Sequence, residues 1–317
     1  MKVKKDDALW KGILEDVFDD FLLFMFEEKA EVFDFERPFE FLNKELAQIY
    51  PVDENVAYPK YVDKLVKVFT KQGKEEWILV HVEVQGYNDL DFAERMFTYF
   101  YRILDKFKKR VTCVALFTGN EKLAVTNQYD YAFLGTENHF KYNAYSIIDQ
   151  DIDELSKNSN PFALVVQTAL IALQKGRLGE EHVLQLYNNI ARRLLHANIP
   201  PLKTRAIINF LKYYVSFENK ENITKFEQEI NSLTNNKFTM GIEELLLDRA
   251  ERRGREEGRK EGREEGREEG REEAKEESAI LFVKSLLTDT VFDNNKIASL
   301  TSVDVAFVKE IRAKMAK

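Results

Sequence analysis

The chain has very little cysteine and histidine for its 317 residues, and this shortage excludes two kinds of site. Cys113 is the only cysteine, which excludes a disulfide framework and a metal site built from several thiolates. The four histidines are scattered along the sequence, so their spacing does not indicate a histidine-rich metal site. A lone cysteine is typical of proteins in a reducing compartment, and we therefore expect a cytoplasmic protein.

Long apolar runs are also missing. Near the start of the chain the longest unbroken run covers residues 21–26, whereas a helix that spans a bilayer needs about 20 apolar residues. The first residues include lysines but no apolar segment of the kind found in secretory signals. We therefore expect a protein without a membrane partner.

Positive charge is scarce as well. The 47 lysines and arginines are outnumbered by 55 aspartates and glutamates, which gives a net charge of −8. DNA-binding proteins are usually basic, so this balance weakens the case for a nucleic-acid partner without removing it. Half of the excess lies in residues 254–277, where 7 basic residues stand against 11 glutamates. The remainder of the chain is only mildly acidic.

The sequence does contain a strong signal for a β-hairpin over residues 61–85. Two runs rich in valine, leucine and aromatic residues flank a turn at residues 71–74, which contains Gly73. In the second run apolar and other side chains alternate with a period of two, as expected for a strand. We expect the rest of the chain to be organised around this hairpin.

Two acidic residues occupy facing positions of the hairpin. If the turn is centred on Gly73, Asp63 lies directly opposite Glu83, and Gln85 lies on the same face one pleat beyond. A register shift of two residues would leave the acids diagonal to each other, and a shift of one would separate them and expose valines. Two facing carboxylates repel, so the pair favours a bound cation, and hard oxygen ligands suit Mg²⁺ or Mn²⁺.

Asp63 followed by Glu83-Val84-Gln85 on the next strand resembles the motif of the PD-(D/E)XK nuclease superfamily. The similarity is to its transposase-associated, recombination-promoting branch, in which glutamine commonly replaces the superfamily lysine. Other segments resemble that branch too: LWKGILEDVFDDFLLF, FEFLNKEL, HVEVQ, FAERMFTYFYRI and the glycine-arginine-glutamate repeat. The resemblance is good over roughly residues 6–150. It implies an α/β fold, a mixed central sheet flanked by helices (a restriction-endonuclease-like core) followed by a helical region.

The resemblance also implies an activity, a Mg²⁺-dependent DNA endonuclease that hydrolyses phosphodiester bonds in connection with mobile elements or recombination. Asp63 and Glu83 would hold Mg²⁺, with Mn²⁺ as the other candidate, and Gln85 would orient the attacking water. Supporting roles are implied for a helical acid and for two residues of the following helix, namely Glu45, Arg95 and Tyr99. The planar guanidinium of Arg95 suits a phosphate or a carboxylate.

Plainer readings of these residues remain open. Glu45 and Arg95 are also compatible with ordinary solvated positions on helices. The whole chain is compatible with a weak or inactive nuclease-fold protein that binds DNA without cutting it. It is also compatible with an oligomerising scaffold, a homo-oligomer in which the repeat and the tail are the functional part.

The remaining pattern predicts four segments: a nuclease-like core over 1–150, a helical subdomain over 151–250, a repeat spacer over 251–278 and a small helical module over 279–317. Within the core we expect helices from Asp6 or Asp7 to about residue 27, over 39–50, and from Asp89 or Asp91 to about residue 109. Strands are expected over 111–119 and 139–149.

The charged segments also carry predictions. The acids of the first helix, Glu15, Asp16, Asp19 and Asp20, are expected on a solvated face. The four-residue repeat over residues 254–273 indicates a marginal solvated helix or a flexible spacer. Two basic clusters, Arg192-Arg193 and Lys203 with Arg205, are candidate DNA contacts or solvated pairs.

Overall fold

The computed structural model describes residues 2–42, 61–83, 91–119, 127–234 and 242–315. The chain divides into two compact units, residues 1–246 and residues 247–317. Among the described residues no helix is long and apolar enough to cross a membrane. We call them the first and the second unit.

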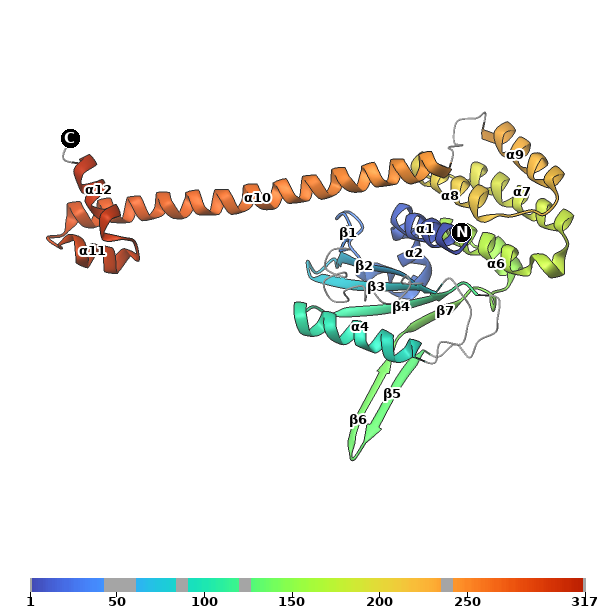
Figure 1. The fold of residues 1–317 in the computed structure, drawn as a ribbon, viewed down its shortest axis with the longest axis horizontal. Helices are drawn as coiled ribbons and strands as arrows, with labels where there is room; N and C mark the ends of the chain where they lie inside the picture. The colour runs from blue at the N-terminus through green and yellow to red at the C-terminus, as the bar shows by residue number, and fades with distance from the viewer. Residues whose placement is uncertain (1, 43–60, 84–90, 120–126, 235–241, 316–317) are drawn as a thin grey trace. The chain divides into compact units, whose positions relative to one another are not determined.

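A mixed sheet of five strands forms the centre of the first unit (Figure 1), which confirms the predicted α/β class. Its strands, in spatial order, are β1 (Glu40–Phe41), β2 (Tyr61–Phe69), β3 (Glu75–Glu83), β4 (Val111–Phe117) and β7 (Asn143–Ser146). The first three pair antiparallel, whereas β3–β4 and β4–β7 pair parallel. The parallel step needs a crossover, and α4 (Phe92–Phe107) provides it between β3 and β4.

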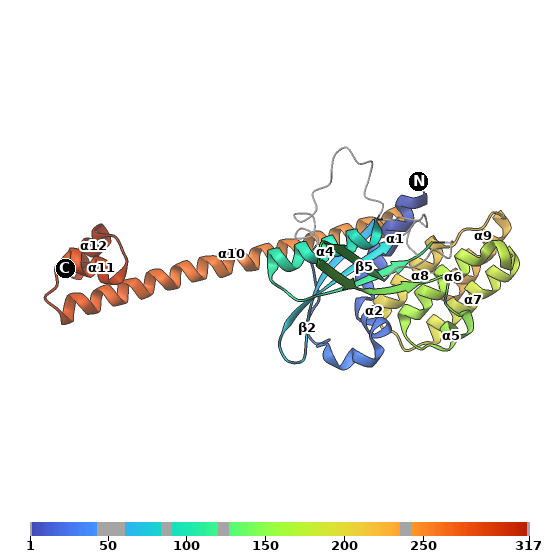
Figure 2. The ribbon, with the colours of Figure 1, turned by 90° about the horizontal axis from the view of Figure 1, so that it is seen from below.

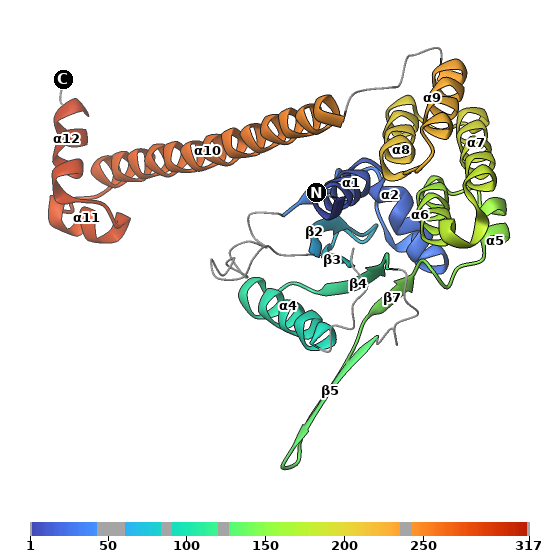
Figure 3. The same ribbon diagram turned by 45° about the vertical axis from the view of Figure 1, so that its right-hand side comes forward.

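Both faces of the sheet are covered by helices (Figure 3). One face packs against α1 (Lys2–Asp16), α2 (Phe18–Met25) and the helices that follow the sheet, in a cluster called here the main core. The sheet residues of the main core are Val66, Val68, Ile78, Val114 and Leu116. The other face packs against α4 in a second core, whose sheet residues are Leu65, Cys113 and Ala115. Alternating residues of one strand therefore belong to different cores, as a period of two requires.

The N-terminal helix differs from its prediction. Helix α1 extends to Lys2, so Asp6 and Asp7 lie inside it and do not cap its start. The helical path is interrupted at Val17, a fully buried β-branched residue with φ −132° and ψ 38°, after which α2 begins. A short 3₁₀ helix, η1 (Glu27–Val32), then leads toward β1.

The acids of α1 and α2 are not all solvated, which corrects the expectation for this helix. Glu15 forms an ion pair with the buried Lys64 of β2. Asp19 and Asp20 both bind Lys203, with Oδ2–Nζ distances of 2.5 and 2.7 Å. Burial raises the pKa of Asp20, although the hydrogen bond from Lys203 opposes that shift. These pairs join segments that are far apart in the sequence, which is why local spacing did not reveal them.

Five helices follow the sheet and gather in one layer (Figure 2). They are α5 (Ile152–Lys157), α6 (Pro161–Leu178), α7 (Glu180–His196), α8 (Pro201–Tyr214) and α9 (Lys220–Thr234). Prolines begin α6 and α8, where the missing N–H costs nothing. Phe162 packs 5.2 Å from Phe21, and Phe210 packs 5.2 Å from Trp10. The helical layer and the N-terminal helices therefore share the main core, and residue 150 does not separate two cores.

Two other local predictions need correction, and one strand was not predicted. The expected helix over 39–50 begins instead as β1, and residues 43–60 lie outside the described residues. The expected strand over 139–149 is two strands, β6 (Thr136–Lys141) and β7, which belong to different sheets. The change of sheet occurs at Tyr142, whose N–H donates to the Asn127 carbonyl at 2.9 Å. Strand β5 (Gln128–Phe133), the partner of β6, was not predicted.

The β5–β6 pair forms an arm that projects from the sheet (Figure 1). Its base is held by ring contacts to α4, since Tyr129 stacks on Phe97 at 5.2 Å and Phe140 lies 4.8 Å from Phe100. Two-stranded pairs are only marginally stable without such support.

The second unit contains most of α10 (Ile242–Asp289), which is helical throughout the repeat. This agrees with the helical form of the prediction for residues 254–273. Arginine and glutamate are good helix formers, and they offset the glycine that recurs every fourth residue. The end of α10 packs with α11 (Asn294–Thr301) and α12 (Val305–Met315) around Val283, Ile297 and Val308, which confirms the predicted short helices.

Two neighbouring leucines of α2 provide a test of the packing in the main core of the first unit. Leu22 is fully buried and Leu23 is 36% exposed. We expect Leu22→Ala to lower the free energy of unfolding by about 2–5 kcal/mol because it leaves a cavity, and Leu23→Ala to change it by about 0.5 kcal/mol or less. Urea unfolding followed by tryptophan fluorescence measures this, since Trp10 and Trp77 both belong to the first unit. Equal losses in the two variants would contradict the assignment of α2 to the main core.

Candidate functional site

The hairpin β2–β3 has the tight turn that the sequence predicted. The Gly73 N–H donates to the Thr70 carbonyl at 2.8 Å, and the Thr70 N–H donates to the Lys74 carbonyl at 2.9 Å. Gly73 has φ 76°, in the left-handed region that glycine adopts without strain. Nine residues of each strand pair on either side of this turn.

The register of the hairpin differs by two residues from the predicted one. Asp63 lies opposite His81, and Glu83 lies opposite Tyr61, so the predicted direct pairing of Asp63 with Glu83 is wrong. The cause is the turn, because the last pair before it is Phe69 with Glu75 and the loop is therefore centred one residue before Gly73. Asp63 and Glu83 become diagonal neighbours, positions that are typically about 7–8 Å apart.

Several of the predicted site residues fall outside the description. Glu45 and Gln85 are not among the described residues, and for Asp63 and Glu83 only the backbone is described. Within the part of the chain that the structure describes, no three His, Cys, Asp or Glu side chains come together as a metal cluster. At the hairpin site the structure gives the backbone register of the two acids.

Helix α4 places its predicted site residues in different environments. Tyr99 is buried in the second core and is only 4% exposed. Arg95 is half-buried, with its guanidinium carbon 5.4 Å from the centre of the Phe92 ring. Arg102 is exposed. Of the two arginines, Arg95 therefore lies closer to the core side of the helix.

The N-terminal turn of α4 lies at the same end of the sheet as Glu83. Strand β4 ends at Phe117, which is the register partner of Glu83. The rings of Phe117 and Phe92 are 5.1 Å apart, and Phe92 is the first residue of α4. The contact from Arg95 to Phe92 extends this link, so the cation and the acidic strand end belong to one neighbourhood.

The cysteine is not part of a reactive site. Cys113 lies on β4 in the second core, and burial raises the pKa of its thiol to about 12. A thiol with such a pKa stays protonated near neutral pH and is a poor nucleophile.

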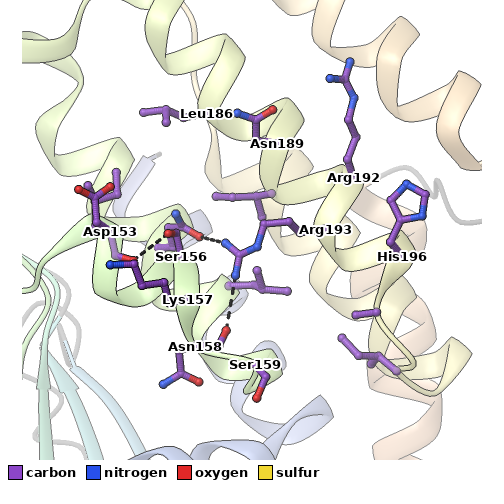
Figure 4. Close-up of a pocket in the computed structure, with 16 residues that line it drawn as sticks. Asp153, Ser156, Lys157, Asn158, Ser159, Leu186, Asn189, Arg192, Arg193 and His196 are labelled. Atoms are coloured by element: carbon purple, nitrogen blue, oxygen red, sulfur yellow. Dashed lines mark hydrogen bonds between the residues drawn. The ribbon is translucent and has the colours of Figure 1, made fainter.

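In the two basic clusters of the helical layer, Lys203 and Arg192 form ion pairs, whereas Arg193 hydrogen-bonds to neutral groups. Lys203 is held by Asp19 and Asp20, and Arg192 donates to Glu229 at 2.5 Å. Arg193 instead points into a cavity of about 770 Å³ between α5, α6 and α7 (Figure 4). Its partner there is Gln167, a buried amide within the apolar run of α6.

Sequence reasoning did not single out Gln167. The available signal was one amide in the run PFALVVQTALIAL, where a polar side chain surrounded by buried positions needs a partner.

No protein-family model matches this chain, and no curated protein or solved structure matches it either.

The thiol of Cys113 is expected to be inert in the folded protein. Because the chain has one cysteine, titration with a chromogenic disulfide reagent reports on this residue alone. We expect less than a tenth of the thiol to react in native buffer at pH 8 within the time that the denatured chain needs for full reaction. Equal rates before and after denaturation would contradict the burial of β4.

Proposed function

We propose that this chain is a metal-dependent endonuclease that hydrolyses phosphodiester bonds of DNA, built on a restriction-endonuclease-like core and acting in recombination or on mobile elements. The observation that carries the proposal is the register of β2–β3, in which Asp63 and Glu83 are diagonal neighbours. The order of elements supports it, because a helix, a hairpin, a second helix and a parallel strand follow one another as in the superfamily that the sequence resembles.

Strand alternation supports a common side for the two acids. Leu65 on β2 and its register partner on β3, Leu79, are odd-numbered, and Leu65 belongs to the second core under α4. Asp63 and Glu83 are odd-numbered positions of the same two strands. Regular alternation therefore assigns both to the α4 side of the sheet, where Arg95 lies.

The donor set fits a magnesium or manganese ion. Carboxylate oxygens are the ligands that these hard cations prefer, and diagonal positions on neighbouring strands allow two side chains to converge on one ion. Asp63 and Glu83 would hold the metal, and Glu45 would be a third acid. When bound, the metal would lower the pKa of a coordinated water and stabilise negative charge on a phosphate oxygen.

Residues of the chain would orient the attacking water, supply positive charge and hold α4 in position. Gln85 would orient the attacking water through its amide, but it supplies no charge. The cation that the superfamily lysine provides is then missing, and Arg95 is a described candidate to replace it on this side of the sheet. Tyr99, which is buried in the second core, would support the position of α4.

Cleavage of supercoiled plasmid tests the metal ligands. We expect nicking in Mg²⁺ or Mn²⁺ that EDTA abolishes, and a loss of about 10³-fold or more in rate for Asp63→Asn and Glu83→Gln, because each removes an anionic ligand. Glu75→Gln is the matched control, since it makes the same change at the other end of β3 and should cut like wild type.

Two outcomes would count against this proposal. Cleavage by Glu83→Gln at the wild-type rate would exclude the hairpin as the site. DNA binding by wild type and Glu83→Gln alike, without cleavage by either in any metal, would favour the inactive DNA-binding protein.

The role of Arg95 has its own test. We expect Arg95→Gln to lower the rate of plasmid cleavage by about 10²-fold, because a cation that stabilises developing phosphate charge is lost. Arg102→Gln removes the same charge from the exposed side of the same helix and should change the rate less than threefold. Gel-shift affinity for DNA is measured in parallel, so that a loss of binding is distinguished from a loss of turnover. Equal effects of the two variants would show that only the net charge of α4 matters.

A further inference from the structure

A cavity of about 770 Å³ lies in the helical layer, apart from the hairpin acids. It opens between α5, the turn before α6, and α7 (Figure 4). Its volume is within the range of about 300–1,000 Å³ that is usual for small-molecule sites. Apolar side chains of α6 and α7 form one part of its wall, namely Leu164, Leu186 and Ile190.

Arg193 is the central polar group of this cavity (Figure 4). Its Nη1 donates to Gln167 Oε1 at 2.8 Å, and its Nη2 makes a long contact of 3.5 Å to the Asn158 carbonyl. Both acceptors are neutral. Among the described residues no carboxylate forms an ion pair with Arg193, whereas its neighbour Arg192 binds Glu229.

The surroundings of Arg193 hold the guanidinium in place without neutralising it. Gln167 is only 5% exposed, so its amide is a fixed support and not a mobile surface group. Arg193 is half-buried, and this partial loss of water lowers the pKa of its guanidinium. A half-buried cation without a counter-ion is unfavourable, and an oxyanion that enters the cavity would relieve this cost. Two of its five N–H groups have protein acceptors, so donors remain for a ligand.

The rim of the cavity adds further basic groups. Lys157 from α5 and His196 from the end of α7 line it, against one acid, Asp153. Ser156 and Asn189 also line the cavity and supply a hydroxyl and an amide. The cavity thus combines an anion-binding end, hydrogen-bonding groups and an apolar surface.

We propose that this cavity binds a small phosphorylated molecule of nucleotide size, with its phosphate on Arg193 and its body against Leu164 and Ile190. A terminal phosphate can reach a half-buried guanidinium within a cavity. The phosphodiesters of a duplex lie along a wide ridge and are normally contacted by rows of exposed basic side chains. The site is independent of the nuclease proposal, because it uses none of the hairpin residues.

Binding of AMP and of inorganic phosphate to the full-length protein tests the site, by calorimetry and by the shift in unfolding temperature. Wild type is expected to bind AMP. Arg193→Met should weaken AMP binding at least about tenfold, the usual cost of a charge-assisted hydrogen-bond pair. Lys157→Gln should weaken it severalfold. Arg177→Gln is the matched control, because it removes the same charge from an exposed position of α6 that does not line the cavity, and it should bind AMP like wild type.

The variants also separate binding from a purely structural role. If Arg193 only braces α6 and α7, Arg193→Met will lower the unfolding temperature in the absence of ligand and leave the AMP affinity of the folded protein unchanged, which would overturn the proposal. Lys157 is exposed and its substitution leaves the packing intact, so this variant decides the question even where Arg193→Met does not fold. Failure of wild type to bind either AMP or phosphate would also overturn it. So would binding of a 20-base-pair duplex that depends on Arg193 when AMP does not bind, because this cavity would then be part of a DNA surface.

Discussion

Burial of the sheet on both faces is the constraint on which the first unit depends. Even-numbered residues of β2 and β4 fill the main core, and odd-numbered residues such as Leu65 and Cys113 fill the second core. A register shift of one residue would exchange the two sets, and each would meet a surface shaped for the other. The two-sided burial therefore determines which side of the sheet every other strand position occupies. The proposed metal site follows from this constraint, because it needs both acids on the side of α4.

The sequence allowed the elements of this unit to be predicted better than their pairing. Alternation in β3, the apolar run of β4 and the helical spacing of α4 each depend on a few neighbouring residues, so these elements are visible locally. The register of β2–β3 depends on how many residues the turn uses, and Gly73 marks the turn without revealing its centre. Tyr142, where the chain leaves the β5–β6 arm for the sheet, has no local signal, because its backbone partner Asn127 adjoins β5, on the other side of the arm.

Charge was the property that composition described least well. A net charge of −8 indicates a solvated acidic surface, yet several acids bind cations between elements. Lys203 binds Asp19, which is 184 residues away in the sequence. Glu180 accepts backbone hydrogen bonds from Glu218 and Asn219 and one from the Lys175 side chain, which lower its pKa to about 2. Such acids hold the helical layer together. Arg193 differs from the cations that they bind, because its described partners are neutral.

The continuous helicity of α10 gives the repeat a simple geometric property. A four-residue unit is slightly longer than one helical turn, so each unit lengthens the helix by about 6 Å and rotates all that follows by about 40°. Duplication or deletion of one unit in the gene would keep the reading frame and the charge pattern. It would change, in fixed steps, the distance and the rotation between the start of α10 and the helices α11 and α12. A change in the number of repeats would therefore alter the length of α10 without changing any packed surface.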